Sequence, residues 1–250
     1  MEESNSHISS INSDQLQGVV DNIVKQFSSQ EKEKYRDTTL SEVATNLLSV
    51  GLIFPISLDL NDLREANLLL QQEDGKQKAI SFLQEKVEFH DRIEFHDKDM
   101  ELSIISWELF DIVHAAPSEW KETLDESKNL FLKNEENFRV ILPLYYSYLE
   151  NKIRFYHGEK TISVSNRLVN DFKEKLRKEL SKDDFIEYEA LLKAIKKNLL
   201  RSKPFTNRNV GVNRNSVLHG VLPPSRWEKF NFYQVVFSLN LLDFLFQRKE

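Results

Sequence analysis

The chain contains no cysteine among its 250 residues. Disulfide bonds, thiolate zinc sites and a cysteine nucleophile are therefore excluded, and a reducing cytoplasm is the expected location. Glycine and proline are also scarce, at six residues each. So few turn-forming residues disfavour a β-sandwich and favour long helices, and the sequence therefore predicts an all-α fold.

Long apolar runs are missing as well. No uninterrupted run approaches the roughly 20 apolar residues that a membrane-spanning helix needs, and the N-terminus has no basic segment followed by an apolar one. We therefore expect no membrane partner. The apolar fraction of 40%, which includes 17 Phe, is still enough for a hydrophobic core.

Charge is distributed unevenly along the chain. Residues 1–150 hold 14 Lys and Arg against 29 Asp and Glu, whereas residues 151–250 hold 20 against 11. A basic segment is suited to a polyanionic partner, because neutralising phosphates releases counterions. Alternatively, the two parts attract one another, or the lysine-rich helices are simply solvated surfaces.

Periodic apolar residues predict a series of helices after a flexible tail over residues 1–12. Longer and more basic helices begin near Asn134, so we divide the rest into an acidic helical regulatory or interaction region, residues 13–133, and a basic helical bundle, residues 134–250. The predicted helices cover residues 13–27, 42–50, 60–70, 80–87, 102–113, 120–132, 138–156, 165–180, 185–199 and 225–247. Asp99 is expected to cap the helix over 102–113.

The tetrad Glu-Phe-His-Asp occurs twice, beginning at Glu88 and at Glu94. Its histidines and carboxylates are suitable zinc or manganese ligands. On a helix, however, His90 and His96 would point apart, and only an extended strand would place them on one face. We therefore expect a solvated acidic loop and no metal site.

The last predicted helix begins with the capping box Ser225-Arg226-Trp227-Glu228 and is apolar almost all round. Such a helix must be covered on most sides. Either it runs through the middle of the bundle, or one of its faces packs against a second copy of the chain.

The octet Asn213-Arg214-Asn215-Ser216-Val217-Leu218-His219-Gly220 gathers an arginine, an amide and a histidine within about two helical turns. Arginine presents a charged planar fork that fits phosphate oxygens, and histidine can give or take a proton near neutral pH. Gly220 is expected to close this helix. The combination suits phosphodiester chemistry, although the helix dipole alone also favours a histidine at this position.

The octet resembles the Arg-x4-6-His signature of the HEPN superfamily, which often carries a polar residue after the arginine and often ends in Leu-His-Gly. The resemblance implies an up-and-down helical bundle that dimerises, and many members are metal-independent endoribonucleases without a cofactor. It implies that His219 acts as general base or acid, that Arg214 binds the scissile phosphate, and that Asn215 orients the phosphate or the imidazole. Such proteins commonly act as toxins or antiviral effectors that an antitoxin or a regulatory protein keeps silent.

Basic residues on the predicted helix over 185–199 and just beyond it extend this hypothesis to RNA binding. The candidates are Lys193, Lys196, Lys197, Arg201 and Arg208.

Two other functions are compatible with the sequence. One is a non-catalytic helical module that binds RNA or a protein, and the other is a purely structural protein in which His219 is buried. No phosphate-binding glycine-rich loop, Ser-His-Asp arrangement or zinc-ligand spacing supports another class of enzyme.

Overall fold

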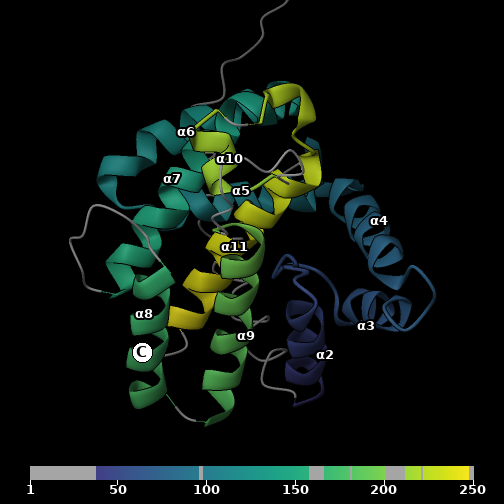
Figure 1. The fold of residues 1–250 in the computed structure, drawn as a ribbon. Coiled ribbons are helices and arrows are strands. Elements are labelled where there is room, and N and C mark those ends of the chain that lie inside the picture. Colours follow the sequence, from purple (N-terminus) through teal and green to yellow (C-terminus); the bar gives the residue numbers. More distant parts are fainter. Residues whose placement is uncertain are drawn as a thin grey trace, which may run out of the picture.

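The computed structural model describes residues 38–95, 98–157, 166–180, 182–200, 212–220 and 222–247. Within these ranges the chain folds into packed helices with one two-stranded antiparallel hairpin (Figure 1), which confirms the predicted helical class. None of the helices in these ranges combines the length and the apolar character that a bilayer span requires.

In chain order, the elements are α2 (Thr38–Ser49), α3 (Leu60–Leu69), α4 (Gly75–Glu88), β1 (His90–Phe95), β2 (Lys98–Ser103), α5 (Ile104–Ala115), α6 (Ser118–Lys133), the 3-10 helix η1 (Glu135–Asn137), α7 (Phe138–His157), α8 (Asn166–Glu179), α9 (Lys182–Asn198), α10 (Arg214–Leu218), the 3-10 helix η2 (Pro224–Arg226) and α11 (Lys229–Gln247).

Most predicted helices correspond closely to observed ones. The predicted helix over 138–156 is α7, and the helices predicted over 165–180 and 185–199 are α8 and α9. Gly51 closes α2 with a φ of +82°, a backbone conformation that glycine adopts without strain. The tail over 1–12 and the helix predicted over 13–27 lie outside the described residues.

The acidic loop predicted around the repeated tetrad is instead the β1–β2 hairpin. Its strands pair antiparallel, with His90 opposite Ser103. Asp99 therefore lies within β2 and does not cap the next helix. That role belongs to Ser103, whose buried hydroxyl accepts a hydrogen bond from the backbone N–H of Ser106.

The last helix begins later than the predicted capping box. Pro224–Arg226 form η2, and the backbone of Trp227 is extended, with ψ of 134°, so helical geometry resumes only at Lys229. The indole of Trp227 points inward and donates a hydrogen bond to the carbonyl of Leu222 at 2.9 Å. The inward packing of the Trp227 side chain therefore explains why α11 does not begin at the predicted capping box.

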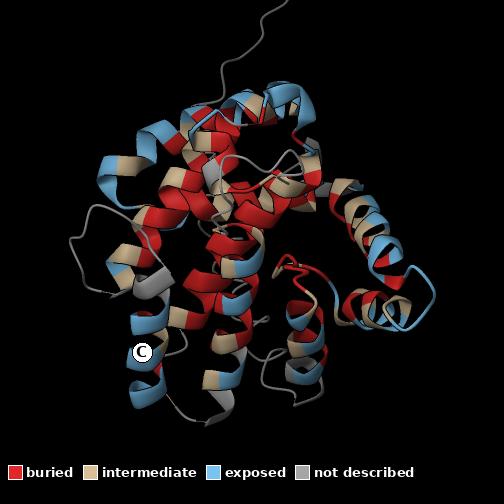
Figure 2. Cartoon of the chain, viewed as in Figure 1, coloured by how far each residue is buried: buried red, intermediate tan, exposed pale blue. Residues whose placement is uncertain are grey.

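Helix α11 occupies the middle of the bundle. It packs against α5, α7 and α9 of the same chain (Figure 1), and buried residues follow one another along it (Figure 2). Of the two explanations for its apolar character, the central position within one chain is therefore the one observed. A second copy is not needed to cover it.

Three buried polar side chains of α11 fix it against three different segments. Gln234 exchanges hydrogen bonds with the backbone N–H and carbonyl of Ile53. Asn240 binds Glu108 of α5, and the carboxylate of Asp243 accepts hydrogen bonds from Lys152 and Tyr156 of α7. Because a buried polar group without a partner is costly, these bonds specify how the otherwise apolar helix is rotated and aligned.

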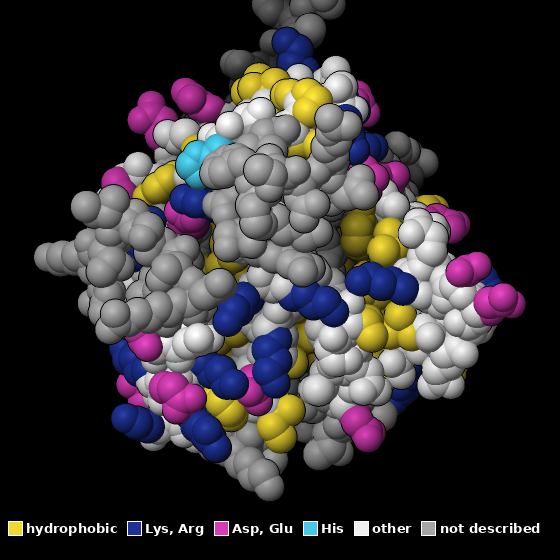
Figure 3. Space-filling view, in the orientation of Figure 1, with side chains coloured by type: hydrophobic (Ala, Val, Ile, Leu, Met, Phe, Trp, Pro, Cys, Tyr) yellow, Lys and Arg dark blue, Asp and Glu magenta, His cyan; other side chains and the backbone are white. Residues whose placement is uncertain are grey.

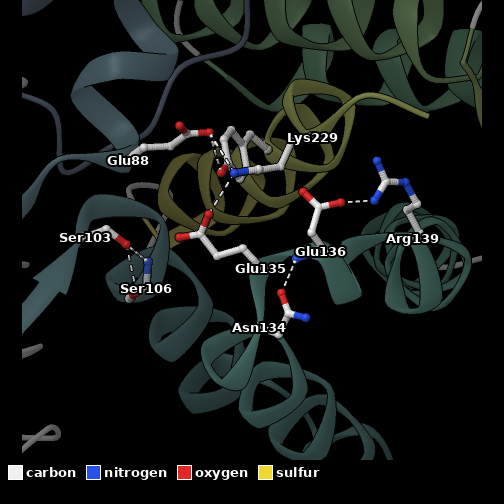
Figure 4. A network of polar contacts seen from close by, with 9 residues as sticks. Glu88, Ser103, Ser106, Asn134, Glu135, Glu136, Arg139 and Lys229 are labelled. Atoms are coloured by element: carbon white, nitrogen blue, oxygen red, sulfur yellow. Dashed lines mark hydrogen bonds and ion pairs between the residues drawn. The ribbon is translucent and has the colours of Figure 1, made fainter. Parts of the chain in front are cut away.

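The beginning of α11 is fixed by an ion cluster (Figure 4). The ammonium of Lys229 lies 2.8 Å from a carboxylate oxygen of Glu135 in η1 and 3.4 Å from one of Glu88 at the end of α4. Tyr233, one turn later, donates a hydrogen bond to the same Glu88 oxygen at 2.9 Å. The cluster therefore joins α4, η1 and α11.

The acidic and the basic part of the chain share one hydrophobic core. Buried residues of α2 to α6 and of α7 to α11 belong to a single contiguous cluster, and α2 packs on α9. The boundary between residues 133 and 134 therefore separates regions of different charge and proposed function. It does not separate two hydrophobic cores, since the core is continuous across it.

Glu108 is a fully buried carboxylate with neutral partners, and it makes the stability of the fold depend on pH. It accepts hydrogen bonds from the hydroxyl of Ser57 at 2.7 Å and from the amide of Asn240 at 2.6 Å. Burial nevertheless raises the pKa of the Glu108 carboxyl above its ordinary value of 4.5. The folded chain therefore keeps this proton to a higher pH than the unfolded chain does.

The contribution of Glu108 is consequently greatest below its unfolded pKa and is lost as the pH rises through the raised folded pKa. Glu108→Gln, which cannot ionise, is expected to gain stability relative to the wild type across this window, by at most about 1.4 kcal/mol per pH unit. Urea unfolding at a series of pH values measures the difference. A difference that stays constant with pH would contradict the prediction.

Candidate functional site

The octet forms a short, capped helix. Asn213 precedes α10, and its side-chain oxygen accepts a hydrogen bond from the backbone N–H of Ser216 at 3.1 Å. The hydroxyl of Ser216 in turn accepts one from the backbone N–H of Asn213 at 2.9 Å. Both side chains are buried, so this reciprocal arrangement acts as a capping box and sets where α10 begins.

Helix α10 ends at Leu218, so it is shorter than predicted and His219 is the first residue after it. The backbone N–H of Leu222 turns back to the carbonyl of Ser216 at 3.0 Å, and Gly220 has a φ of +63°. Gly220 therefore closes the helix as predicted. His219 itself is exposed, which contradicts the hypothesis of a structural protein with a buried His219.

Arg214 is paired with a buried glutamate from another helix. Its Nε forms an ion pair with one carboxylate oxygen of Glu150 in α7, and the other oxygen lies 3.3 Å from Nη2 of Arg154. The Glu150 side chain is only 7% exposed, whereas those of Arg214 and Arg154 are 22% and 25% exposed. One carboxylate thus holds two guanidinium groups, and the three side chains carry a net charge of +1.

The trio of Glu150, Arg154 and Arg214 links the arginine of the motif to helix α7. Because α10 has only five residues, its own backbone gives Arg214 little support. The anchor comes from α7, which is itself fixed to α11 through Lys152 and Asp243. An arginine whose guanidinium is paired with a buried carboxylate is restricted in position, which lowers the entropic cost of binding an anion.

The sequence did not indicate Glu150 or the role of Arg154. Arg154 stands outside the octet, and Glu150 falls among apolar positions of α7. A signal did exist, because Leu142, Tyr146, Glu150 and Ile153 follow helical spacing and the other three are core residues. A charged residue at a core position needs a partner, but the spacing does not say which one.

The predicted RNA-binding lysines lie on α9, close in the chain to the motif. Lys193 and Lys197 are exposed, and Lys196 is partly exposed. The end of this helix adjoins α10, since the backbone N–H of Arg214 donates to the carbonyl of Leu199 at 2.7 Å. Arg201 and Arg208 lie outside the described residues.

Other candidates from the sequence are placed only in part. Asn215 lies in α10, but its side chain is outside the described part of the structure, as are the side chain of His90 and the whole of His96. Among the side chains that the structure does describe, no three His, Asp or Glu residues converge in a way that could hold a metal ion.

Comparison of the chain with protein-family models, with curated proteins and with solved structures found no match. What points to a function is therefore the site itself: an exposed histidine that follows a capped five-residue helix, and an arginine at the start of that helix that a buried glutamate holds in place.

Proposed function

We propose that the chain is a metal-independent endoribonuclease of the HEPN type, in which His219 and Arg214 act on the scissile phosphate. The observation that carries this proposal is the exposed His219 directly after the short helix whose first residue is an arginine that Glu150 orients. Toxin or antiviral defence is the biological role that fits such an activity, with an antitoxin or regulatory protein as the partner that silences it.

The reaction follows from what RNA offers and what these residues supply. A base removes the proton of the 2′-OH, the 2′-oxygen attacks phosphorus, and the bond to the 5′-oxygen breaks as an acid protonates that oxygen. The products are a 2′,3′-cyclic phosphate and a free 5′-OH. His219 is the base or the acid, and Arg214 stabilises the negative charge that builds up on the phosphorane. Asn215 would orient the phosphate or the imidazole.

The net charge of the trio supports anion binding. If Glu150 faced Arg214 alone, the pair would be neutral, but Arg154 adds a second positive charge beside the same carboxylate. These three side chains together carry a charge of +1, which supports the binding of a phosphate near Arg214.

A homodimer completes the proposed chemistry, because each chain brings one motif histidine whereas the reaction needs a base and an acid. The apolar α11 no longer argues for such a dimer. The dimer is therefore proposed from the chemistry alone.

One observation favours a second candidate function. Because Glu150 engages the guanidinium of Arg214, the arginine is partly neutralised before any phosphate arrives. That arrangement is compatible with a non-catalytic helical module that binds RNA or a protein, and such a module would bind without cleaving.

The deciding experiment is cleavage of labelled RNA in the presence of EDTA. We expect cleavage to persist, to leave cyclic phosphate and 5′-OH ends, and to stop when a single 2′-deoxy nucleotide replaces the ribonucleotide at the cleaved position. Gel analysis of end-labelled products measures all three results. Binding without cleavage would favour the second candidate, and cleavage that EDTA abolishes would contradict the proposed mechanism.

A further inference from the structure

A lysine from the acidic part of the chain lies beside the basic end of α9. Lys76, the second residue of α4, donates a hydrogen bond from Nζ to the carbonyl of Val50 at 2.8 Å. The next carbonyl, that of Gly51, accepts a hydrogen bond from the side chain of Asn198, the last residue of α9. The start of α4 and the end of α9 therefore meet at the end of α2.

This meeting point is closely packed. A Cβ atom at Gly51 would lie 2.7 Å from Nδ2 of Asn198, so a larger residue, besides being strained at the φ of +82°, would have to displace the Asn198 amide. Lys197, the neighbour of Asn198 in α9, is exposed, so a second ammonium group belongs to this end of the helix. Burial, the larger cause, and the charge of Lys197 both lower the pKa of Lys76.

The positive charge of α9 is concentrated at this end. Lys193, nearer the middle of the helix, shares the carboxylate of Glu189 with Lys173 of α8, at 3.1 Å from one of its oxygens. Lys196, by contrast, donates to the neutral amide of Asn170 at 3.1 Å. Among the side chains that the structure describes, no carboxylate forms an ion pair with Lys196, Lys197 or Lys76.

The same end of α9 adjoins the candidate site. Leu199, two residues beyond Lys197, accepts the hydrogen bond from the backbone N–H of Arg214. Lys and Arg side chains also gather on the face of the molecule that carries α8 and α9 (Figure 3). The lysines at the end of α9 therefore lie close in the chain to a residue that contacts the backbone of Arg214.

We propose that Lys76, Lys196 and Lys197 form a second RNA-binding surface, which holds backbone phosphates of a single strand beyond the scissile one. The inference rests on the proposed ribonuclease function and extends it, because it assigns part of the RNA-binding surface to α4, in the acidic region. Contacts of ammonium groups with phosphates do not depend on base identity, so this surface contributes affinity without sequence preference.

The test measures binding in a His219→Ala background, so that it does not depend on cleavage. A fluorescein-labelled 12-nucleotide oligouridylate is titrated with protein at several salt concentrations, and anisotropy gives the affinity. One lost phosphate contact lowers the slope of log K against log salt by about 0.7, which corresponds to about a fivefold weaker affinity at 0.1 M salt. We expect this change for Lys76→Gln and again for Lys197→Gln.

Lys78→Gln is the matched control, because Lys78 is also on α4 but donates to Gln72. Lys197→Gln keeps the test decisive if Lys76→Gln weakens the fold, since Lys197 is exposed and makes no ion pair within the described structure. Affinities and salt slopes equal to those of Lys78→Gln would overturn the proposal. So would polyglutamate of equal charge competing as well as RNA, because the surface would then bind acidic protein segments.

The two proposals can fail separately. If the protein binds RNA through these lysines but never cleaves it, the RNA-binding surface is supported and the ribonuclease proposal is contradicted. If the lysine substitutions change neither cleavage nor affinity, the ribonuclease proposal is supported and the RNA-binding surface is contradicted.

Discussion

His219→Ala is expected to lower the rate of RNA cleavage by about 10²- to 10⁴-fold, the usual contribution of a positioned general acid or base. The protein should stay folded, because His219 is exposed and lies after the last residue of α10. Initial rates on a labelled oligoribonucleotide, together with thermal unfolding followed by circular dichroism, measure both effects.

His114→Ala is the matched control. His114 is likewise an exposed histidine, in the last turn of α5, but it is outside the motif. The His114→Ala substitution should leave the rate of RNA cleavage unchanged. Equal loss in both variants would indicate a general effect of histidine removal, and full activity of His219→Ala would remove the proposed chemistry.

Mixing wild-type and His219→Ala chains tests whether two protomers share one reaction. If base and acid come from different chains, only pairs of wild-type chains are active, and an equal mixture that has exchanged subunits keeps about one quarter of the activity. If each chain acts alone, half remains. Retention of half would contradict the dimeric mechanism while leaving His219 in its role.

The helices could be predicted because their signals are local. Apolar residues three and four positions apart identified α7 to within one residue, since this spacing alone defines the face of a helix that is buried. The β1–β2 hairpin gave no such signal. Only Ile93 and Phe95 alternate as apolar residues in β1, which is too short a pattern to distinguish a strand from a loop.

The site was predictable to the extent that it is local in sequence. Arg214 and His219 stand in one octet, and α10 with the residue that follows it spans this spacing. Glu150 precedes Arg214 by more than sixty residues in the chain, so their ion pair depends on how α7 and α10 pack. Tertiary contacts of this kind leave no periodic trace in a single sequence.

Two buried glutamates illustrate how the same residue type serves different purposes. Glu108 has neutral hydrogen-bond donors, so burial raises its pKa and its ionised form is a cost to the fold. Glu150 has two guanidinium partners instead, which compensate its charge. The first holds α5 to α11, whereas the second holds the proposed catalytic arginine. Only the second is expected to affect both stability and activity.

Glu150→Gln is therefore expected to lower the free energy of unfolding by about 1–3 kcal/mol, the cost of removing one partner from a largely buried hydrogen-bonding or charged contact. Glutamine keeps the size of the side chain but removes the negative charge that Arg214 and Arg154 share. Urea unfolding at neutral pH measures the loss. Glu136→Gln breaks the exposed pair with Arg139 at the start of α7 and should cost less than about 1 kcal/mol.

Steady-state kinetics of RNA cleavage distinguish a Glu150 that positions Arg214 from one that only stabilises the fold. If Glu150 orients Arg214 for the transition state, kcat of Glu150→Gln should fall more than KM rises, at a temperature well below the unfolding midpoint of the variant. Glu150→Asp, which keeps the charge but shortens the side chain, should recover part of both losses. Glu150→Gln/Arg154→Gln should be more stable than Glu150→Gln alone, because one of the two positive charges beside residue 150 is gone. A Glu150→Gln chain as stable and as active as the wild type would show that Arg214 does not need this carboxylate, and the proposed site would lose its anchor.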